Sequence, residues 1–340
     1  MHARSNLSES DCAGFYHWPP LWIGAPPVEQ GGDFTPAVMN AEVFSATLQC
    51  GVSLKVSRQG LFVFDFAQWG PGSSALANNP LDNWEERVFT RMRVMNLFLA
   101  CFYTSVHRIQ KSTSGKLFID YTTYIAARSF ALDPRHVECD LRTRSVIKDA
   151  EAWHRRFKPV CTTVPGKVLH AAAEMTDAAI AQGFPGVAVL AELLLHAFYL
   201  HESGKYEGSH ITAWTIAERC LRELWKTHLG QLDSQYTGAD SEEKFINSER
   251  KQKLTGGDFT ASVISEKLSL AGVLPCDRYK LVSQVRKTRN AWLHDLHAIG
   301  REDAGKAIVL AQFMLRETGV LDVDILFPVF GTMPIAWVGD

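Results

Sequence analysis

Six helices are predicted in the second half of the chain, and they constrain its fold more than any other feature of the sequence. From Pro165 onward, apolar residues recur at the three- and four-residue spacing that gives a helix one buried face. Six such helices suffice to build a bundle around a shared apolar core. The predicted helices cover residues 166–181, 185–201, 210–229, 258–271, 278–296 and 303–318.

The first half of the chain has a mixed character instead. Residues 52–57 alternate apolar and polar side chains, and residues 61–66 continue as a more buried strand after a turn at Gln59 and Gly60. This pattern predicts a β-hairpin. Further segments predict helices at residues 81–108 and 142–157 and a strand at residues 116–121.

The character of the sequence changes near residue 160, so we predict two domains in an α+β protein. Residues 1–160 are expected to form a mixed α/β domain, and residues 161–340 an all-helical bundle. Residues 231–257 are polar and charged, which predicts a long mobile insertion between bundle helices. The first domain carries no catalytic or phosphate-binding motif, so we expect it to serve in sensing or targeting.

The composition of the chain indicates a soluble globular protein. It has 340 residues, of which 46% are hydrophobic and 21% charged. The longest apolar run, residues 187–200, is shorter than the roughly 20 residues that a membrane-spanning helix needs. The N-terminus lacks the apolar core of a signal peptide, so we expect a cytoplasmic location. Because the seven cysteines are spread singly, we expect no disulfide framework, metal or cofactor.

The helix predicted at residues 278–296 carries Arg289 in the gap of its apolar stripe. The stripe consists of Val282, Val285, Trp292, Leu296 and Ile299. An arginine cannot lose its proton in a protein, and an unpaired buried guanidinium costs several kcal/mol in order of magnitude. Arg289 is therefore expected either to pair across a subunit interface or to bind an anion.

Three polar residues of the same helix, Arg286, Asn290 and His294, stand four residues apart and so share one side. Asn290 is placed to bond one ring nitrogen of His294 and leave the other for proton transfer. Arg289 lies roughly 140° from His294 on a straight helix. The two are therefore expected to meet at one phosphate only across a subunit seam or where the helix ends.

The segment from Arg289 to His294, with the sequence RNAWLH, resembles the motif of the HEPN family. Ribonucleases of that family carry an arginine, often followed by asparagine, and a histidine a few residues later. Residues 259–268 and 270–275 resemble the helix and the turn that often precede the motif helix. The resemblance covers roughly residues 185–318 and implies a small antiparallel helical bundle. It also implies a homodimer that places two motifs in a shared groove.

The family resemblance implies roles for the motif residues. Cleavage in HEPN ribonucleases needs no metal and uses the RNA 2′-hydroxyl as nucleophile, leaving a 2′,3′-cyclic phosphate. Carried over, this makes His294 the acid or base, Arg289 the clamp on the phosphate and Asn290 the orienting residue. Proteins that join a sensor domain to such a bundle often act in bacterial antiviral defence or as toxins, so a regulatory partner protein is also expected.

The net charge of −2 argues against a protein that coats nucleic acid nonspecifically, so any RNA site must be locally basic. A basic run without acids precedes and includes the motif arginine. The residues expected to bind RNA are Arg278, Lys280, Arg286 and Lys287. Two residues, Glu218 and His297, are expected to support the motif, Glu218 as the inward partner of an arginine.

Other interpretations of the motif remain open. In the simplest, Arg289 pairs with Asp295 or Glu218, and His294 is a surface histidine. In another, the bundle is a noncatalytic module that uses Arg289 to grip a nucleotide, a nucleic acid or a protein. In a third, Arg289 forms an ion pair between subunits and serves only dimerisation.

Overall fold

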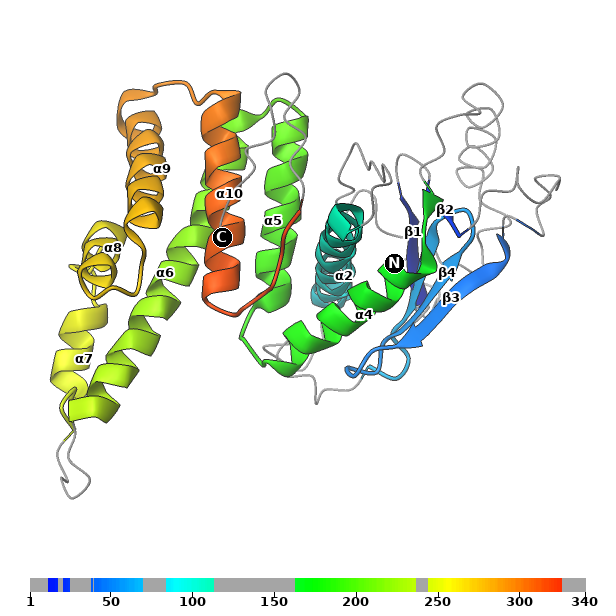
Figure 1. Ribbon diagram of the computed structural model, residues 1–340, viewed down its shortest axis with the longest axis horizontal. Helices are drawn as coiled ribbons and strands as arrows, with labels where there is room; N and C mark the ends of the chain where they lie inside the picture. Colours follow the sequence, from blue (N-terminus) through cyan, green and yellow to red (C-terminus); the bar gives the residue numbers. More distant parts are fainter. Residues whose placement is uncertain are drawn as a thin grey trace, which may run out of the picture. The chain divides into compact units, whose positions relative to one another are not determined.

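The computed structural model describes residues 12–17, 21–24, 38, 40–69, 84–112, 163–236 and 244–325 (Figure 1). The chain divides into two compact units. The first, here called the sheet unit, comprises Met1–Glu192 and Asp324–Asp340, and the second, the helical unit, comprises Leu193–Val323. The division thus differs from the predicted boundary at residue 160. The strand predicted at 116–121 and the helix predicted at 142–157 lie outside the described residues.

The sheet unit contains a four-stranded antiparallel sheet with the strand order β1-β5-β4-β3. Its strands are β1 (Cys12–Tyr16), β3 (Glu42–Thr47), β4 (Ser53–Ser57) and β5 (Leu61–Asp65). The predicted hairpin is confirmed, since β4 and β5 pair in antiparallel register with Val56 opposite Phe62. Gly60 turns between them with a φ of +77°, a conformation that side chains with a Cβ atom rarely adopt. A short parallel pair joins β2 (Trp22–Ile23) and β6 (Thr163–Val164).

Two helices of the sheet unit, α2 (Trp84–Ser112) and α4 (Gly166–Ala181), pack against each other. Aromatic rings of α2 also meet the sheet edge-on. The ring of Phe98 lies 5.7 Å from that of Phe64, and the ring of Phe102 lies 5.7 Å from that of Phe62. All four are fully buried, so the core of this unit is aromatic.

The helical unit follows the order predicted from the apolar pattern, with helix ends that differ by several residues. Its helices are α6 (Tyr206–Tyr236), α7 (Ser248–Thr255), α8 (Ala261–Leu270), α9 (Cys276–Asp295) and α10 (Arg301–Glu317), together with the second part of α5 (Val187–Glu202). Figure 1 shows α6 beside α10; α9 contacts both of them, and α8 contacts α6 and α9. Small buried residues such as Ala213, Ala217, Ala307 and Ala311 allow α6 and α10 to pack closely. The fold is thus α+β, with a small antiparallel sheet first and a mostly helical part after it.

Most of the described residues of the insertion predicted at 231–257 are helical. Helix α6 continues to Tyr236, and α7 occupies most of the segment after residue 247. Trp225 explains this order, because its indole Nε1 donates a hydrogen bond to the carbonyl oxygen of Leu254 at 2.7 Å. Asp233 likewise accepts from the backbone nitrogen of Ile246 at 2.7 Å. These two hydrogen bonds connect both described ends of the segment to α6.

Within the described ranges, no helix combines the length and the apolar content needed to cross a membrane.

Candidate functional site

Helix α9 presents the motif, and its last turn departs from the predicted stripe. Val282 and Val285 are buried, as expected, and Ile299 is buried beyond the helix. Leu296 is 80% exposed, so its predicted place in the core is wrong. The reason is local: α9 ends at Asp295, and Leu296 adopts a left-handed conformation with a φ of 53° that turns the chain away.

A buried histidine of α6 fixes α9 in place. His210 is fully buried, and its Nε2 and Nδ1 atoms each lie 3.1 Å from a backbone carbonyl oxygen, of Val285 in α9 and of Asp303 in α10 respectively. Burial lowers the pKa of His210, while the two carbonyl contacts oppose that shift. Val285 is one helical turn before Arg289, so this contact holds the motif helix at the level of the site.

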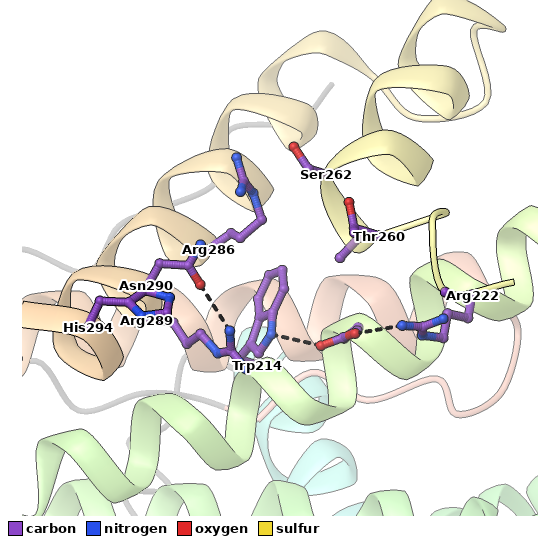
Figure 2. Close-up of a pocket in the computed structure, with 11 residues that line it drawn as sticks. Trp214, Arg222, Thr260, Ser262, Arg286, Arg289, Asn290 and His294 are labelled. Atoms are coloured by element: carbon purple, nitrogen blue, oxygen red, sulfur yellow. Dashed lines mark hydrogen bonds and ion pairs between the residues drawn. The ribbon is translucent and has the colours of Figure 1, made fainter.

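The motif residues Arg289, Asn290 and His294 line one pocket of about 360 Å³ within the helical unit. Three walls enclose it (Figure 2): α9, α6 and the start of α8. The lining residues are Trp214, Glu218 and Arg222 from α6, Gly257, Thr260, Ala261 and Ser262 at the start of α8, and Arg286, Arg289, Asn290 and His294 from α9. Arg289 and His294 therefore line one pocket in a single chain.

A hydrogen bond explains how Arg289 reaches the face of its helix that carries Asn290 and His294. The Nη1 atom of Arg289 donates to the Oδ1 atom of Asn290 at 2.9 Å. Successive residues of a helix point about 100° apart, and Asn290 shares its face with Arg286 and His294. The bond to Asn290 thus draws the guanidinium toward that face.

The same bond changes the expected role of Asn290. Its side-chain oxygen is engaged by Arg289, and no hydrogen bond between Asn290 and His294 occurs among the described residues. Asn290 therefore orients the arginine. The His294 side chain is exposed at the pocket.

Glu218 lines the pocket, but its partners are not the motif arginine. Its Oε2 atom accepts from the indole Nε1 of Trp214 at 3.0 Å, and its Oε1 atom accepts from Nη2 of Arg222 at 3.0 Å. In the part of the chain that the structure describes, Arg289 forms no ion pair, with Glu218, Asp295 or any other acid. The structure therefore does not support the simple interpretation in which Arg289 is paired with an acid.

The charges at the pocket are predominantly positive. Three arginines and one glutamate line it, and Glu218 offsets the charge of Arg222. Arg286 and Arg289 remain as excess positive charge beside the exposed imidazole of His294. A concave site with this charge is suited to an anion, and arginine is the side chain best shaped to bind phosphate oxygens in pairs.

The other residues that the sequence singled out are not in the pocket. Arg278 lies with its guanidinium carbon 4.2 Å from the ring centre of Phe313 and is 3.3 Å from Asp277, which accounts for it structurally. The basic residues Lys280 and Lys287 are exposed and do not line the pocket. His297 is exposed beyond the end of α9 and does not line it either. Of the predicted basic group, only Arg286 joins the motif.

Of the pocket's opposite wall, sequence reasoning singled out only Glu218. Arg222 was visible only as an i,i+4 partner of Glu218, and nothing in the sequence placed the start of α8 beside them. One available signal was Thr260, whose hydroxyl oxygen caps α8 by accepting from the backbone nitrogen of Val263 at 3.5 Å. That signal locates the helix start but not its neighbours.

Comparisons of the chain with protein-family models, with curated proteins and with solved structures found no match. A functional assignment therefore depends on the pocket and on the motif that lines it.

Proposed function

We propose that the protein is a metal-independent endoribonuclease of the HEPN type, with the pocket of the helical unit as its active site. The observation that supports this most is that Arg289 and His294 line one pocket of a single chain. They do so beside Arg286, and Arg289 is oriented by a neutral amide rather than neutralised by an acid. A cation that binds phosphate and an imidazole that exchanges protons are the two groups that RNA transesterification requires.

In the proposed reaction, Arg289 and Arg286 bind the phosphate that is to be cleaved. The 2′-hydroxyl oxygen of the preceding ribose attacks the phosphorus, and its proton passes to a base. The bond to the 5′-oxygen then breaks, and that oxygen receives a proton. His294 is the pocket residue that exchanges these protons, and Arg289 stabilises the negative charge that develops on the phosphate. The products are a 2′,3′-cyclic phosphate and a 5′-hydroxyl.

The biological setting follows from the family resemblance. We propose that the active protein is a homodimer in the cytoplasm, that RNA is its substrate, and that the sheet unit senses or targets. A role as a toxin or an antiviral defence effector, held in check by a regulatory partner protein, fits this arrangement.

A noncatalytic nucleotide-binding module is the alternative. The observation in its favour is the size of the pocket, because about 360 Å³ lies within the range of sites that enclose a small ligand. In that case the three arginines would serve affinity alone.

Cleavage of a mixed RNA pool in EDTA tests the proposal. The parent protein should produce fragments with cyclic phosphate ends, and His294→Ala and Arg289→Ala should each slow cleavage by about 100-fold or more, the usual effect of removing an acid–base or charge-stabilising group. His297→Ala is the matched control, since His297 is exposed three residues after His294 and does not line the pocket. Intact RNA that is nevertheless retained by the parent protein would favour the binding module.

A further inference from the structure

Helix α6 contributes an arginine of its own, Arg222, to the lining of the pocket. Figure 2 shows Arg222 at one side of the view and His294 at the other, with Trp214 between them. Arg222 comes from a different helix from Arg286 and Arg289, so the pocket offers cationic groups from two walls.

Glu218 fixes the guanidinium of Arg222. Both carboxylate oxygens are engaged, one by Arg222 and the other by the indole of Trp214, which is only 4% exposed. A carboxylate anchored to a buried indole cannot swing freely, so it holds its arginine partner in a preferred orientation. The Glu218 side chain is 29% exposed and that of Arg222 is 41% exposed.

Arg222 retains donors for a ligand. A guanidinium carries five N–H donors in a planar fork, and the bond to Glu218 engages Nη2. Arg222 lines the pocket, and its side chain is 41% exposed. A partly exposed ion pair of this kind contributes little to stability, so it is the place of Arg222 in the pocket lining that points to a binding role.

From this arrangement we infer that Arg222 binds a phosphate next to the one that is cleaved. This inference rests on the proposed function, in which Arg289 binds the scissile phosphate. Single-stranded RNA presents phosphates on both sides of every nucleoside, so one nucleoside inside the pocket would bring its two phosphates to opposite walls.

The chain offers a matched control for Arg222. Arg219 lies on the same helix and pairs with Glu223 at 3.2 Å, in the same i,i+4 geometry as Arg222 with Glu218. Its side chain is 46% exposed, close to the 41% of Arg222, but it does not line the pocket. Substituting either arginine therefore removes one positive charge and one surface ion pair, and only one of the two substitutions changes the pocket.

Binding of a 2′-O-methyl RNA oligonucleotide, which cannot be cleaved through its 2′-oxygen, tests the inference without requiring catalysis. Arg222→Ala should weaken binding by about tenfold and reduce the slope of log affinity against log salt by about 0.7, the contribution of one phosphate contact on a single strand. Arg222→Lys should keep the salt slope, because it keeps the charge. Arg219→Ala should leave affinity and slope unchanged.

Oligonucleotides with a single neutral methylphosphonate locate the contact. At one position the substitution should weaken binding to the parent protein but not to Arg222→Ala, because the charge partner is already gone. The inference is overturned if the methylphosphonate at every position lowers the affinity of Arg222→Ala as much as it lowers that of the parent protein. It is also overturned if Arg219→Ala loses as much affinity as Arg222→Ala. These results are independent of cleavage, so a protein that binds as described but cuts no RNA would refute only the nuclease proposal.

Discussion

Arg289 donates a hydrogen bond from its Nη1 atom to the side-chain oxygen of Asn290 at 2.9 Å, although the two residues are successive in a helix. Their side chains leave the helix about 100° apart, so the bond bends the Arg289 side chain toward the face of the helix that carries Asn290. This relationship brings the guanidinium to the side of the helix that carries His294. The pocket chemistry proposed above depends on it.

Removing the side-chain amide of Asn290 should release the arginine. Asn290→Ala should lower the cleavage rate by about 10- to 100-fold through a misplaced guanidinium, with a change in stability of less than about 1 kcal/mol, because the site is only half-buried. Single-turnover rates together with thermal unfolding check this. A rate equal to that of the parent protein would show that Asn290 does not orient Arg289.

Placing a negative charge at the same position should be more harmful than removing the side chain. In Asn290→Asp, the carboxylate would pair with Arg289 and offset its charge, so the affinity for a non-cleavable RNA should fall below that of Asn290→Ala. The dependence of affinity on salt should weaken as well. The measurement is a salt titration of both variants, and equal affinities would contradict the expected role of charge.

Stability of the helical unit should fall in mild acid. Burial is the first cause that lowers the pKa of His196, His201 and His210 in the folded protein. Below the ordinary histidine value of about 6.5 the unfolded chain therefore binds more protons, which favours unfolding. The free energy of unfolding should be constant above that pH and decrease below it, as measured by urea denaturation between about pH 5 and 8. His210→Gln should reduce this decrease in the free energy of unfolding. If its pH profile equals that of the parent protein, the pKa of His210 is not lowered in the folded state.

The contact between His210 and the carbonyl oxygen of Val285 should also contribute to stability. Removing the ring in His210→Ala should cost about 1–3 kcal/mol, the usual effect of a lost buried hydrogen bond. His297→Ala, at an exposed position, should stay within about 0.5 kcal/mol of the parent. Chemical denaturation of the two variants makes the comparison, and equal losses would show that His210 does not hold α9.

Basic residues inside and outside the pocket should behave differently. Arg286→Ala should reduce both RNA affinity and cleavage rate, because Arg286 lines the pocket. Lys287→Ala removes the adjacent exposed charge and should change affinity less than about threefold without altering the rate. Separate measurement of kcat and KM distinguishes the two, and similar effects on kcat would place the site elsewhere on α9.

The helices and the hairpin could be predicted because their signals are local. Apolar spacing located α4, α5 and α10 within a few residues, and alternation located β4 and β5. The end of α9 was located within one residue. The exposure of Leu296 could not be predicted, because an apolar residue there occupies the left-handed position that usually favours glycine.

The candidate site could be predicted mainly on the helix that carries the motif, with Glu218 of α6 as the one addition. Helical spacing indicated that Arg286, Asn290 and His294 share a face, and the pocket includes all three. The role of Arg222 depends on how α6 packs beside α9, which no local pattern specifies. Glu218 illustrates the limit, since we expected it to be the inward partner of an arginine and the structure pairs it with Arg222 of its own helix.

If Arg289 and His294 of the same chain act on one phosphate, a dimer that joins one Arg289→Ala copy to one His294→Ala copy has no complete pocket. Differently tagged Arg289→Ala and His294→Ala copies would be co-expressed, purified through both tags and assayed for RNA cleavage in EDTA. The mixed dimer should be as inactive as either variant alone, because each pocket then lacks either the guanidinium of Arg289 or the imidazole of His294. The parent dimer should cleave. Recovery of a substantial part of the parent rate by the mixed dimer would contradict this expectation, because the two groups would then be supplied by different copies.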